Sequence, residues 1–379
     1  MSITNNNIFP WRTENSFELL INGVEFYPQM LTAINEAKKF IFLETYFVES
    51  GTITTQFLKT LGDAVSRGVE VFVLFDDMGA RNFNESDRIL LKTQGINLCF
   101  YHPVRFSAFL NNFHRNHRKL LLIDDHLAFI GGAGLSDRFV GVEFWRDNMI
   151  AIQGEVLMDW HSLFIYNWQN HSEIPIIESS FQINHHFNES ALGRLSYTHG
   201  YFFNQIKTHL HHKIKTSKNK IWLASAYFVP SLKLRHLLIQ AAKRGVEIIL
   251  MVPGPNTDNN MSRYIGQSYY NRLLKNKIKI FEYQNRFIHS KVVLVDDWVT
   301  IGSSNLDRWS AKWNLEANQE VKDLYFSNKI STMYQDDILC CTEITFQKWK
   351  KRPISIKLKI WFWKYIGKII TIIGLNGQK

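Results

Sequence analysis

One sequence motif occurs twice in the chain, and it limits the possible folds more than any other feature. Each copy has a histidine, any residue, a lysine, four apolar residues and an aspartate, with small residues after a short turn. The two copies consist of His117, Lys119 and Asp124, and of His289, Lys291 and Asp296. A chain that contains two such copies is expected to be built from two related halves.

Strands and helices are predicted to alternate in the same order in both halves. Apolar runs predict strands at 17–24, 40–47, 69–75, 96–101, 117–123, 221–229, 248–252 and 278–283. Helical spacing predicts helices at 29–37, 57–67, 89–93, 206–214, 234–243 and 269–274, and Tyr27-Pro28 is expected to form a turn. This alternation predicts an α/β fold with a sheet in each half.

Further matching stretches support a duplication at the scale of a domain. Residues 46–48 and 227–229 both read Tyr-Phe-Val, and residues 67–70 and 244–247 both read Arg-Gly-Val-Glu. Between the halves lies a polar stretch whose His185-His186 pair is expected to be solvated. We therefore divide the chain into a first half (1–170), a linker (171–194), a second half (195–345) and a tail (346–379).

The repeated motif has a chemical interpretation. Residues two apart in a strand share a face, so each histidine is expected to point the same way as its lysine. An ammonium neutralises phosphoryl oxygens while an imidazole attacks or transfers a proton. Asp124 and Asp296 point to the other side, where they are expected to cap turns or bind lysines. One copy could be a surface-facing strand end, but packing gives no reason to keep His and Lys in both.

The repeated motif, with Gly-Ser-Ser-Asn at 302–305 after the second copy, resembles that of the phospholipase D superfamily. More narrowly, the chain resembles the bacterial cardiolipin synthases of the shorter type without N-terminal membrane spans. The similarity extends from about Phe17 to Val321. Its supporting stretches are 42–45, 117–119, 129–132, 226–230, 302–307 and 314–318.

This resemblance implies both a fold and a reaction. The fold is a pair of duplicated α/β/α sandwich halves, packed to form one active site at their interface. The reaction is a two-step phosphoryl transfer in which His117 forms a phosphohistidine and His289 serves as acid and base. The resemblance implies no cofactor and no metal, because Lys119 and Lys291 take the place of a cation.

The resemblance also implies supporting residues around the two histidines. Glu316 matches a carboxylate that orients a catalytic histidine, and Asp147 is its expected counterpart in the first half; either could instead be an ordinary surface acid. Ser303 and Asn305 match phosphate-contacting positions. Gly134 departs from the family pattern, which has asparagine there, so the two half-sites are not equivalent.

The formal net charge of +10 belongs to the C-terminal tail. Nine of the 44 basic residues follow Glu343 and no acidic residue does, which leaves 35 basic against 34 acidic residues before it. A nucleic-acid backbone demands a basic groove. The near-neutral globular part therefore disfavours a nucleic-acid partner.

The tail also has the composition of a membrane-surface helix. Residues 354–375 are rich in Ile, Trp, Phe and Leu, but lysines interrupt them. A spanning helix needs about 20 apolar residues without such charges. The pattern favours a basic amphipathic helix in the interface, with aromatic rings at headgroup level. A packed helix covering the core and a short spanning segment are the alternatives.

The expected location follows from the tail and the N-terminus. Residues 1–10 are polar and rich in asparagine, so we expect no secretory signal. Cys99, Cys340 and Cys341 form no paired framework, so we expect reduced thiols. We predict a peripheral protein on the cytoplasmic face of the bacterial cell membrane.

Three functions remain open at this point. The first is a phosphatidyltransferase that forms cardiolipin from the anionic lipid phosphatidylglycerol. The second is a phospholipase D that hydrolyses phospholipids to phosphatidic acid. The third is a nucleic-acid phosphodiesterase of the same superfamily. Transfer and hydrolysis differ in the access of water to the phosphohistidine, which a sequence does not reveal.

Overall fold

The structure is a computed structural model that describes residues 8–104, 114–141, 143–176, 191–199, 203–308 and 313–376. The elements of the first half are β1 (Arg12–Ile21), α1 (Gly23–Glu36), β2 (Phe40–Thr45), α2 (Thr52–Ser66), β3 (Glu70–Asp76), α3 (Glu85–Thr93), β4 (Asn97–Tyr101), β5 (Lys119–Ile123), β6 (Leu127–Gly131), the 3-10 helix η3 (Asp137–Phe139), β7 (Asn148–Gly154) and α4 (Leu157–Gln169).

The second half repeats this order. Its elements are β8 (Ala191–His199), β9 (Phe203–Asn204), α5 (Gln205–Thr216), β10 (Lys220–Ser225), β11 (Phe228–Val229), α6 (Leu232–Lys243), β12 (Glu247–Pro253), α7 (Asn260–Gln267), α8 (Tyr270–Lys275), β13 (Lys279–Tyr283), β14 (Lys291–Val295), β15 (Trp298–Gly302), β16 (Leu306–Asp307), β17 (Ala317–Lys322), α10 (Leu324–Leu339) and β18 (Cys341–Glu343). The tail adds α11 (Phe346–Lys350) and α12 (Ile354–Asn376).

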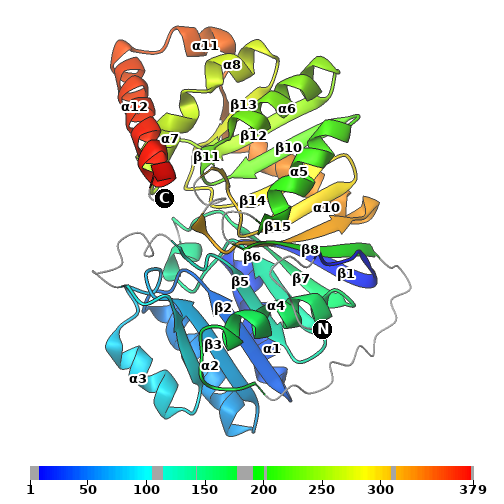
Figure 1. Ribbon diagram of the computed structural model, residues 1–379, viewed down its shortest axis with the longest axis vertical. Coiled ribbons are helices and arrows are strands. Elements are labelled where there is room, and N and C mark those ends of the chain that lie inside the picture. Colours follow the sequence, from blue (N-terminus) through cyan, green and yellow to red (C-terminus); the bar gives the residue numbers. More distant parts are fainter. Residues whose placement is uncertain are drawn as a thin grey trace.

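The two halves share one sheet topology and are joined in a single sheet. In the first half β2, β3 and β4 are parallel, and β5 pairs antiparallel with β2. In the second half β10, β12 and β13 are parallel, and β14 pairs antiparallel with β10. Strands β1 and β8 pair antiparallel at the junction, so the sheet is continuous through both halves (Figure 1). The predicted α/β duplication is confirmed.

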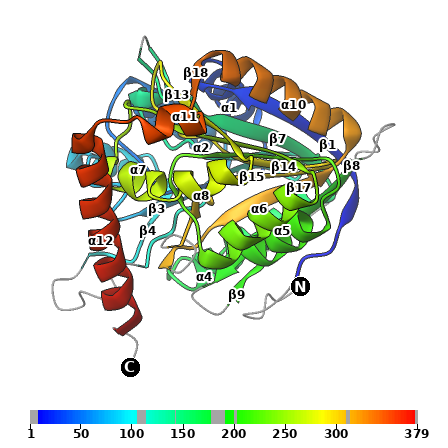
Figure 2. The ribbon, with the colours of Figure 1, turned by 90° about the horizontal axis from the view of Figure 1, so that it is seen from above.

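Helices cover both faces of the sheet. Helices α1 and α2 pack with the first-half strands in one apolar cluster, and α5, α6 and α8 pack with the second-half strands in another. A third cluster contains the buried faces of α4 and α10 together with strand residues from both halves. Figure 2 shows α10 on the opposite side of the sheet from α5 and α6. Both halves therefore contribute to this third cluster.

Some predicted boundaries differ from the structure. Tyr27 and Pro28 lie inside α1, not in a turn. The helix begins before the proline because the amides of Glu25 and Phe26 bond to the carbonyl of Asn22, and the Glu25 carboxylate accepts from the Ile21 amide. The predicted strand 221–229 is two strands, since β11 leaves the main sheet and pairs with β16.

The predicted linker and tail fall partly outside the described residues. Helix α4 ends at Gln169 and β8 begins at Ala191, while residues 177–190 are not described, so the division at 171–194 stays a proposal. Helix α12 packs on α7, burying Ile360 and placing Gly367 against Ile265. No helix within the described ranges has both the length and the hydropathy of a membrane span.

Candidate active site

The two motif histidines lie in extended segments just before β5 and β14, and each segment pairs with the opposite half. The amide of His117 donates to the carbonyl of Leu315 (2.9 Å), which adjoins Glu316. The amide of His289 donates to the carbonyl of Arg146 (2.7 Å), which adjoins Asp147. Backbone pairing thus carries each histidine to a carboxylate from the other half.

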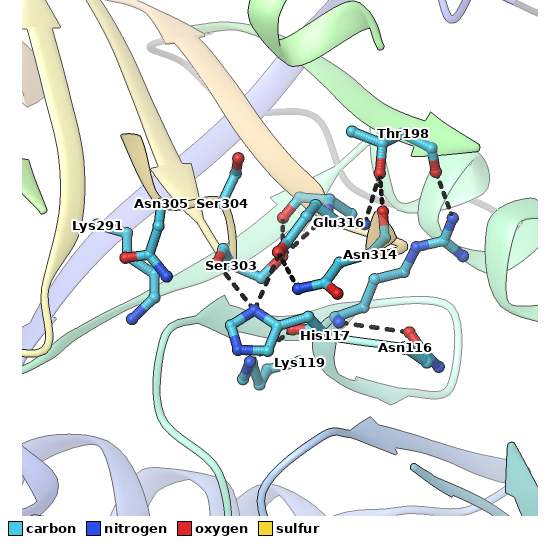
Figure 3. Close-up of polar contacts among 12 residues, drawn as sticks. Asn116, His117, Lys119, Thr198, Lys291, Ser303, Ser304, Asn305, Asn314 and Glu316 are labelled. Carbon is cyan, nitrogen blue, oxygen red and sulfur yellow. Dashed lines mark hydrogen bonds and ion pairs between the residues drawn. The ribbon is translucent and has the colours of Figure 1, made fainter. Parts of the chain in front are cut away.

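His117 is held by the carboxylate of Glu316, the second-half residue that directly precedes β17. Its Nδ1 lies 3.1 Å from Oε2 of Glu316 and 3.2 Å from the carbonyl of Ser303 (Figure 3). Glu316 is fully buried, and it accepts hydrogen bonds from the Ser303 hydroxyl and from Asn314 Nδ2. The Thr198 hydroxyl accepts from the Glu316 amide at 2.8 Å. The glutamate is therefore fixed before substrate arrives.

His289 has the mirror arrangement with a shorter carboxylate. Its Nδ1 lies 2.7 Å from Oδ2 of Asp147, which is fully buried and whose Oδ1 accepts from the Asn148 amide. A Cβ at Gly132 would stand 2.6 Å from this carboxylate, so the glycine is required for the close approach. Gly132 occupies the place that Ser303 has in the second half.

Each lysine follows its histidine on the same face, as predicted. Lys119 Nζ donates to the carbonyl of His117, and Lys291 Nζ donates to the carbonyl of His289 at 2.6 Å. Lys291 Nζ also lies 3.1 Å from both ring nitrogens of His289. His117 Nε2 has no partner among the described residues, which leaves its lone pair free.

The electrostatics favour neutral imidazoles and ionised carboxylates. Burial lowers the pKa of His117, and burial together with Lys291 lowers the pKa of His289 to about 3. Burial opposes ionisation of Asp147 and Glu316, but the facing histidine and the lysines hold the pKa of each carboxyl below its usual value. A carboxylate only accepts, so each Nδ1 carries the proton and each Nε2 presents a lone pair.

Both lysines belong to one electrostatic site. Burial lowers the pKa of Lys119 to about 7, with Lys291 adding to this effect and Glu316 opposing it. Burial also lowers the pKa of Lys291. Two ammonium groups crowded in a buried site are poorly solvated, and a phosphodiester anion between them would relieve that repulsion.

The motif aspartates lie at the far end of their strands, away from the histidines. Asp124 accepts from the amides of residues 38–40 at 2.8–2.9 Å, and Asp296 accepts from the amides of residues 218–220 at 2.8–3.0 Å. Both have positive φ, 48° and 54°. Each caps the turn before the first parallel strand of its half, so we assign both a structural role.

Ser303 and Asn305 do different work in the site. The Ser303 hydroxyl is committed to Glu316 and to the Ala317 amide. The Oδ1 atom of Asn305 accepts from the Tyr227 amide (3.3 Å). At Gly134, the matching first-half position, a Cβ would stand 2.1 Å from the Phe47 carbonyl, which leaves no room for asparagine.

Several buried polar residues around the site were not predicted. Glu44 accepts from Asn116 and Asn167, both at 2.6 Å, and Asp76 accepts from the Asn116 amide at 2.8 Å. This network fixes the segment that leads into His117. The sequence does offer a signal for Glu44, because it is a glutamate within the apolar run 40–47. Thr198, which holds Glu316, has no comparable signal because its partner is 118 residues away.

Within the described ranges, no three His, Cys, Asp or Glu side chains are grouped so that they could hold a metal ion, and the described cysteines are free thiols. The residues His185 and His186 lie outside the described part of the chain.

The lowered pKa of Lys119 predicts a pH effect. Its ammonium is present below pH 7 and is lost as the pH rises through about 7. Because kcat/KM reports the free enzyme, kcat/KM on a phosphodiester substrate should fall above that pH. A Lys119→Arg variant keeps its charge, so its alkaline limb should move to higher pH even if its activity is lower. An unmoved limb in a pH profile of this variant would assign the titration to another group.

Comparisons with known proteins agree with this geometry. The family model for "Cardiolipin synthase, PLD-like domain" matches residues 30–168 and 210–338. A cardiolipin synthase of Clostridium perfringens is 30% identical over 369 residues, covering 93% of this chain and 77% of the relative. Cardiolipin synthase 1 of Staphylococcus aureus is 30% identical and covers 94% of this chain and 74% of the relative. The crystal structure of a Haemophilus influenzae phosphatidylserine synthase has the same fold, with a TM-score of 0.75 at 14% identity, over 97% of this chain and 96% of that one.

Proposed function

The chain belongs to the cardiolipin synthase family of phospholipase D-like proteins, and we propose that it forms cardiolipin from two molecules of phosphatidylglycerol. It is a phospholipase D-type phosphatidyltransferase; the donor, the acceptor and the covalent intermediate are the proposed parts. The observation that carries the proposal is that each motif histidine is bound by a carboxylate of the opposite half, beside two buried lysines. Glu316 binds His117, and Asp147 binds His289.

In the first step His117 Nε2 attacks the phosphorus of one phosphatidylglycerol. The bond from phosphorus to the headgroup glycerol breaks, and His289 gives that glycerol a proton. The pKa of His289 is about 3 without substrate, through burial and Lys291. A bound phosphodiester anion offsets Lys291, so uptake of the proton by His289 accompanies substrate binding.

In the second step the acceptor is the glycerol hydroxyl of another phosphatidylglycerol. His289 removes the hydroxyl proton, the oxygen attacks phosphorus, and the bond to His117 breaks. The products are cardiolipin and the glycerol released earlier. Lys119 and Lys291 stabilise the charge on the phosphoryl oxygens in both steps.

The assignment of His117 as nucleophile follows the family resemblance and gains support from the contacts. His117 Nε2 is free of described partners, whereas the Lys291 ammonium lies 3.1 Å from Nε2 of His289. A cation this close to the ring lowers the electron density at Nε2 and makes that nitrogen a poorer nucleophile. It also places a cation where the acid and base would exchange protons with the alcohol.

The test of this function is an analysis of lipid products. Purified protein is incubated with phosphatidylglycerol in vesicles, and lipids and released glycerol are quantified. Cardiolipin and glycerol in equal amounts are expected. Phosphatidic acid as the sole lipid product would show a hydrolase, and the absence of lipid turnover would return attention to a nucleic-acid phosphodiester substrate.

We also propose that α12 holds the enzyme peripherally on the cytoplasmic face of the membrane. Trp361 and Tyr365 are 66% and 59% exposed, and their rings stack at 6.4 Å between centroids. The exposed lysines of α12 are Lys357, Lys359, Lys364 and Lys368. Exposed aromatic rings among lysines suit the interface of an anionic bilayer. Ile360 of α12 is buried in the second-half apolar cluster, and Gly367 lies against Ile265 of α7, so α12 also has the character of a packed helix.

Because α12 covers part of the core, its exposed aromatics make a cleaner test than its deletion. The Trp361→Ser/Tyr365→Ser double variant should bind phosphatidylglycerol vesicles about tenfold more weakly, through loss of inserted apolar area. Turnover of detergent-dispersed substrate should stay within about twofold of the parent. Vesicle cosedimentation measures the first quantity, and unchanged cosedimentation would count against this surface.

A further inference from the structure

A basic groove lies outside the catalytic site, at the start of α6. The groove has a volume of about 450 Å³ and is lined by Leu232, Lys233, Arg235, His236 and Arg272. The first four residues come from the opening turns of α6, and Arg272 comes from α8. Figures 1 and 2 both show α7 and α8 between α12 and α6, so the groove and the tail helix belong to one side of the second half.

The cations of this groove have no internal counter-ion. Helices α6 and α8 contain no acidic residue. Within the described ranges, no carboxylate lies at ion-pair distance from Lys233, Arg235 or Arg272. Arg235 stacks over the ring of Tyr269 at 4.3 Å, and its Nε is buried without a hydrogen-bond partner. Burial lowers the pKa of Arg235, and Arg272 and Arg308 add to this effect, so an external anion would offset the repulsion among these cations.

The pseudo-symmetric place in the first half contains its own anion. There the Asp137 carboxylate accepts from the first two amides of α2, those of Thr52 (2.9 Å) and Ile53 (2.8 Å). In the second half the residue that matches Asp137 is Arg308, whose guanidinium donates to the carbonyl of Gly367 in α12. A carboxylate has thus been replaced by a cation.

The opening amides of α6 are left without such an acceptor. Ser231 caps the amide of Leu234, but in the described part of the chain nothing accepts from the amides of Leu232 and Lys233. Backbone amides at a helix start, together with lysine and arginine side chains, suit a phosphate group.

We propose that this groove binds the phosphodiester headgroup of an anionic phospholipid in the bilayer, at a site separate from the catalytic one. The exposed apolar side chain decides between a lipid and free phosphate. Leu232 is 68% exposed at the edge of the groove, where it would contact the glycerol and acyl region of a lipid. Arg308 adds to the positive charge felt by Arg235 in the groove and bonds to Gly367 of α12, so headgroup capture and insertion of the tail helix act on the same side of the enzyme.

The groove is tested with a pair of substitutions and a matched pair on the same two helices. Lys233→Gln/Arg272→Gln removes two charges from the groove. Lys243→Gln/Lys275→Gln removes two exposed charges from the other ends of α6 and α8. Cosedimentation is measured with phosphatidylcholine vesicles that contain or lack phosphatidylglycerol. The groove pair should bind the anionic vesicles about tenfold more weakly, and the matched pair should stay within about twofold.

Three outcomes would overturn the proposal. An equal loss in both pairs would show diffuse attraction of the whole surface, and no loss in the groove pair would show that the groove does not bind lipid. Inorganic phosphate that binds the parent protein but not the groove pair, with unchanged vesicle binding, would make the groove a free-phosphate site. Turnover of detergent-dispersed phosphatidylglycerol should be the same in all variants, so a failure of the proposed reaction would be seen separately.

Discussion

Replacing His117 by alanine should reduce phosphatidyl transfer by at least about 10⁴-fold, because it removes the proposed nucleophile of the covalent intermediate. His289→Ala should cause a loss of similar size, since the leaving glycerol then departs without a proton and the acceptor is not deprotonated. The measurement is the initial rate of cardiolipin formation from detergent-dispersed phosphatidylglycerol, which removes membrane binding from the comparison.

A histidine from the same hairpin provides the control for these variants. His126 lies in the turn between β5 and β6, on the side of Asp124 away from the site. His126→Ala should keep activity within a few-fold of the parent protein. If either motif variant retained most of its activity while folded, the shared site would be wrong.

The second large effect concerns Glu316 and Asp147, the carboxylates that bind the histidine of the opposite half. Glu316→Gln and Asp147→Asn should each lower kcat by about 10²–10⁴-fold with a much smaller change in KM. An amide can donate to Nδ1 as well as accept from it, so it no longer fixes the tautomer with a free lone pair on Nε2. The loss should follow the histidine of the opposite half: Glu316→Gln should slow formation of the His117 adduct, whereas Asp147→Asn should slow both proton transfers.

Glu320 supplies a matched control on the same strand as Ala317. It is also a buried glutamate bound to a histidine, with 2.6 Å between Oε1 and Nδ1 of His209, but that pair lies outside the site. Glu320→Gln should lower stability, measured by thermal unfolding, and leave kcat within a few-fold. Equal losses of kcat in the Glu316 and Glu320 variants would reduce the role of Glu316 to folding.

Much of the fold could be predicted because the duplication repeats local signals. Gly68 and Gly245 end matching helices with φ of 91° and 92°, a conformation that glycine adopts freely. Strand β3 and its counterpart β12 read as continuous apolar runs because both faces are covered. The start of α1 could not be predicted, since it depends on a capping arrangement in which Glu25 reaches back to Ile21.

The sequence could indicate which residues form the site, but not the contacts between them. His117 and Lys119 are two residues apart in the extended backbone that leads into β5, so local geometry alone relates them. That Glu316 faces His117, and Asp147 faces His289, depends on pairing between segments 199 and 142 residues apart. No local pattern encodes such a contact. The joined sheet through β1 and β8 is likewise a tertiary feature, because either strand alone could have stayed an edge.

The most direct test of the shared site is to identify the residue that carries the phosphatidyl group during turnover. Enzyme turning over phosphatidylglycerol is quenched in alkali, which preserves the phosphorus–nitrogen bond, and its peptides are examined by mass spectrometry. The expected result is a phosphatidyl adduct on the peptide that contains His117, absent from His117→Ala and absent from the peptide that contains His289. An adduct on His289 would reverse the two roles, and rapid turnover with no adduct on either histidine would contradict the covalent mechanism.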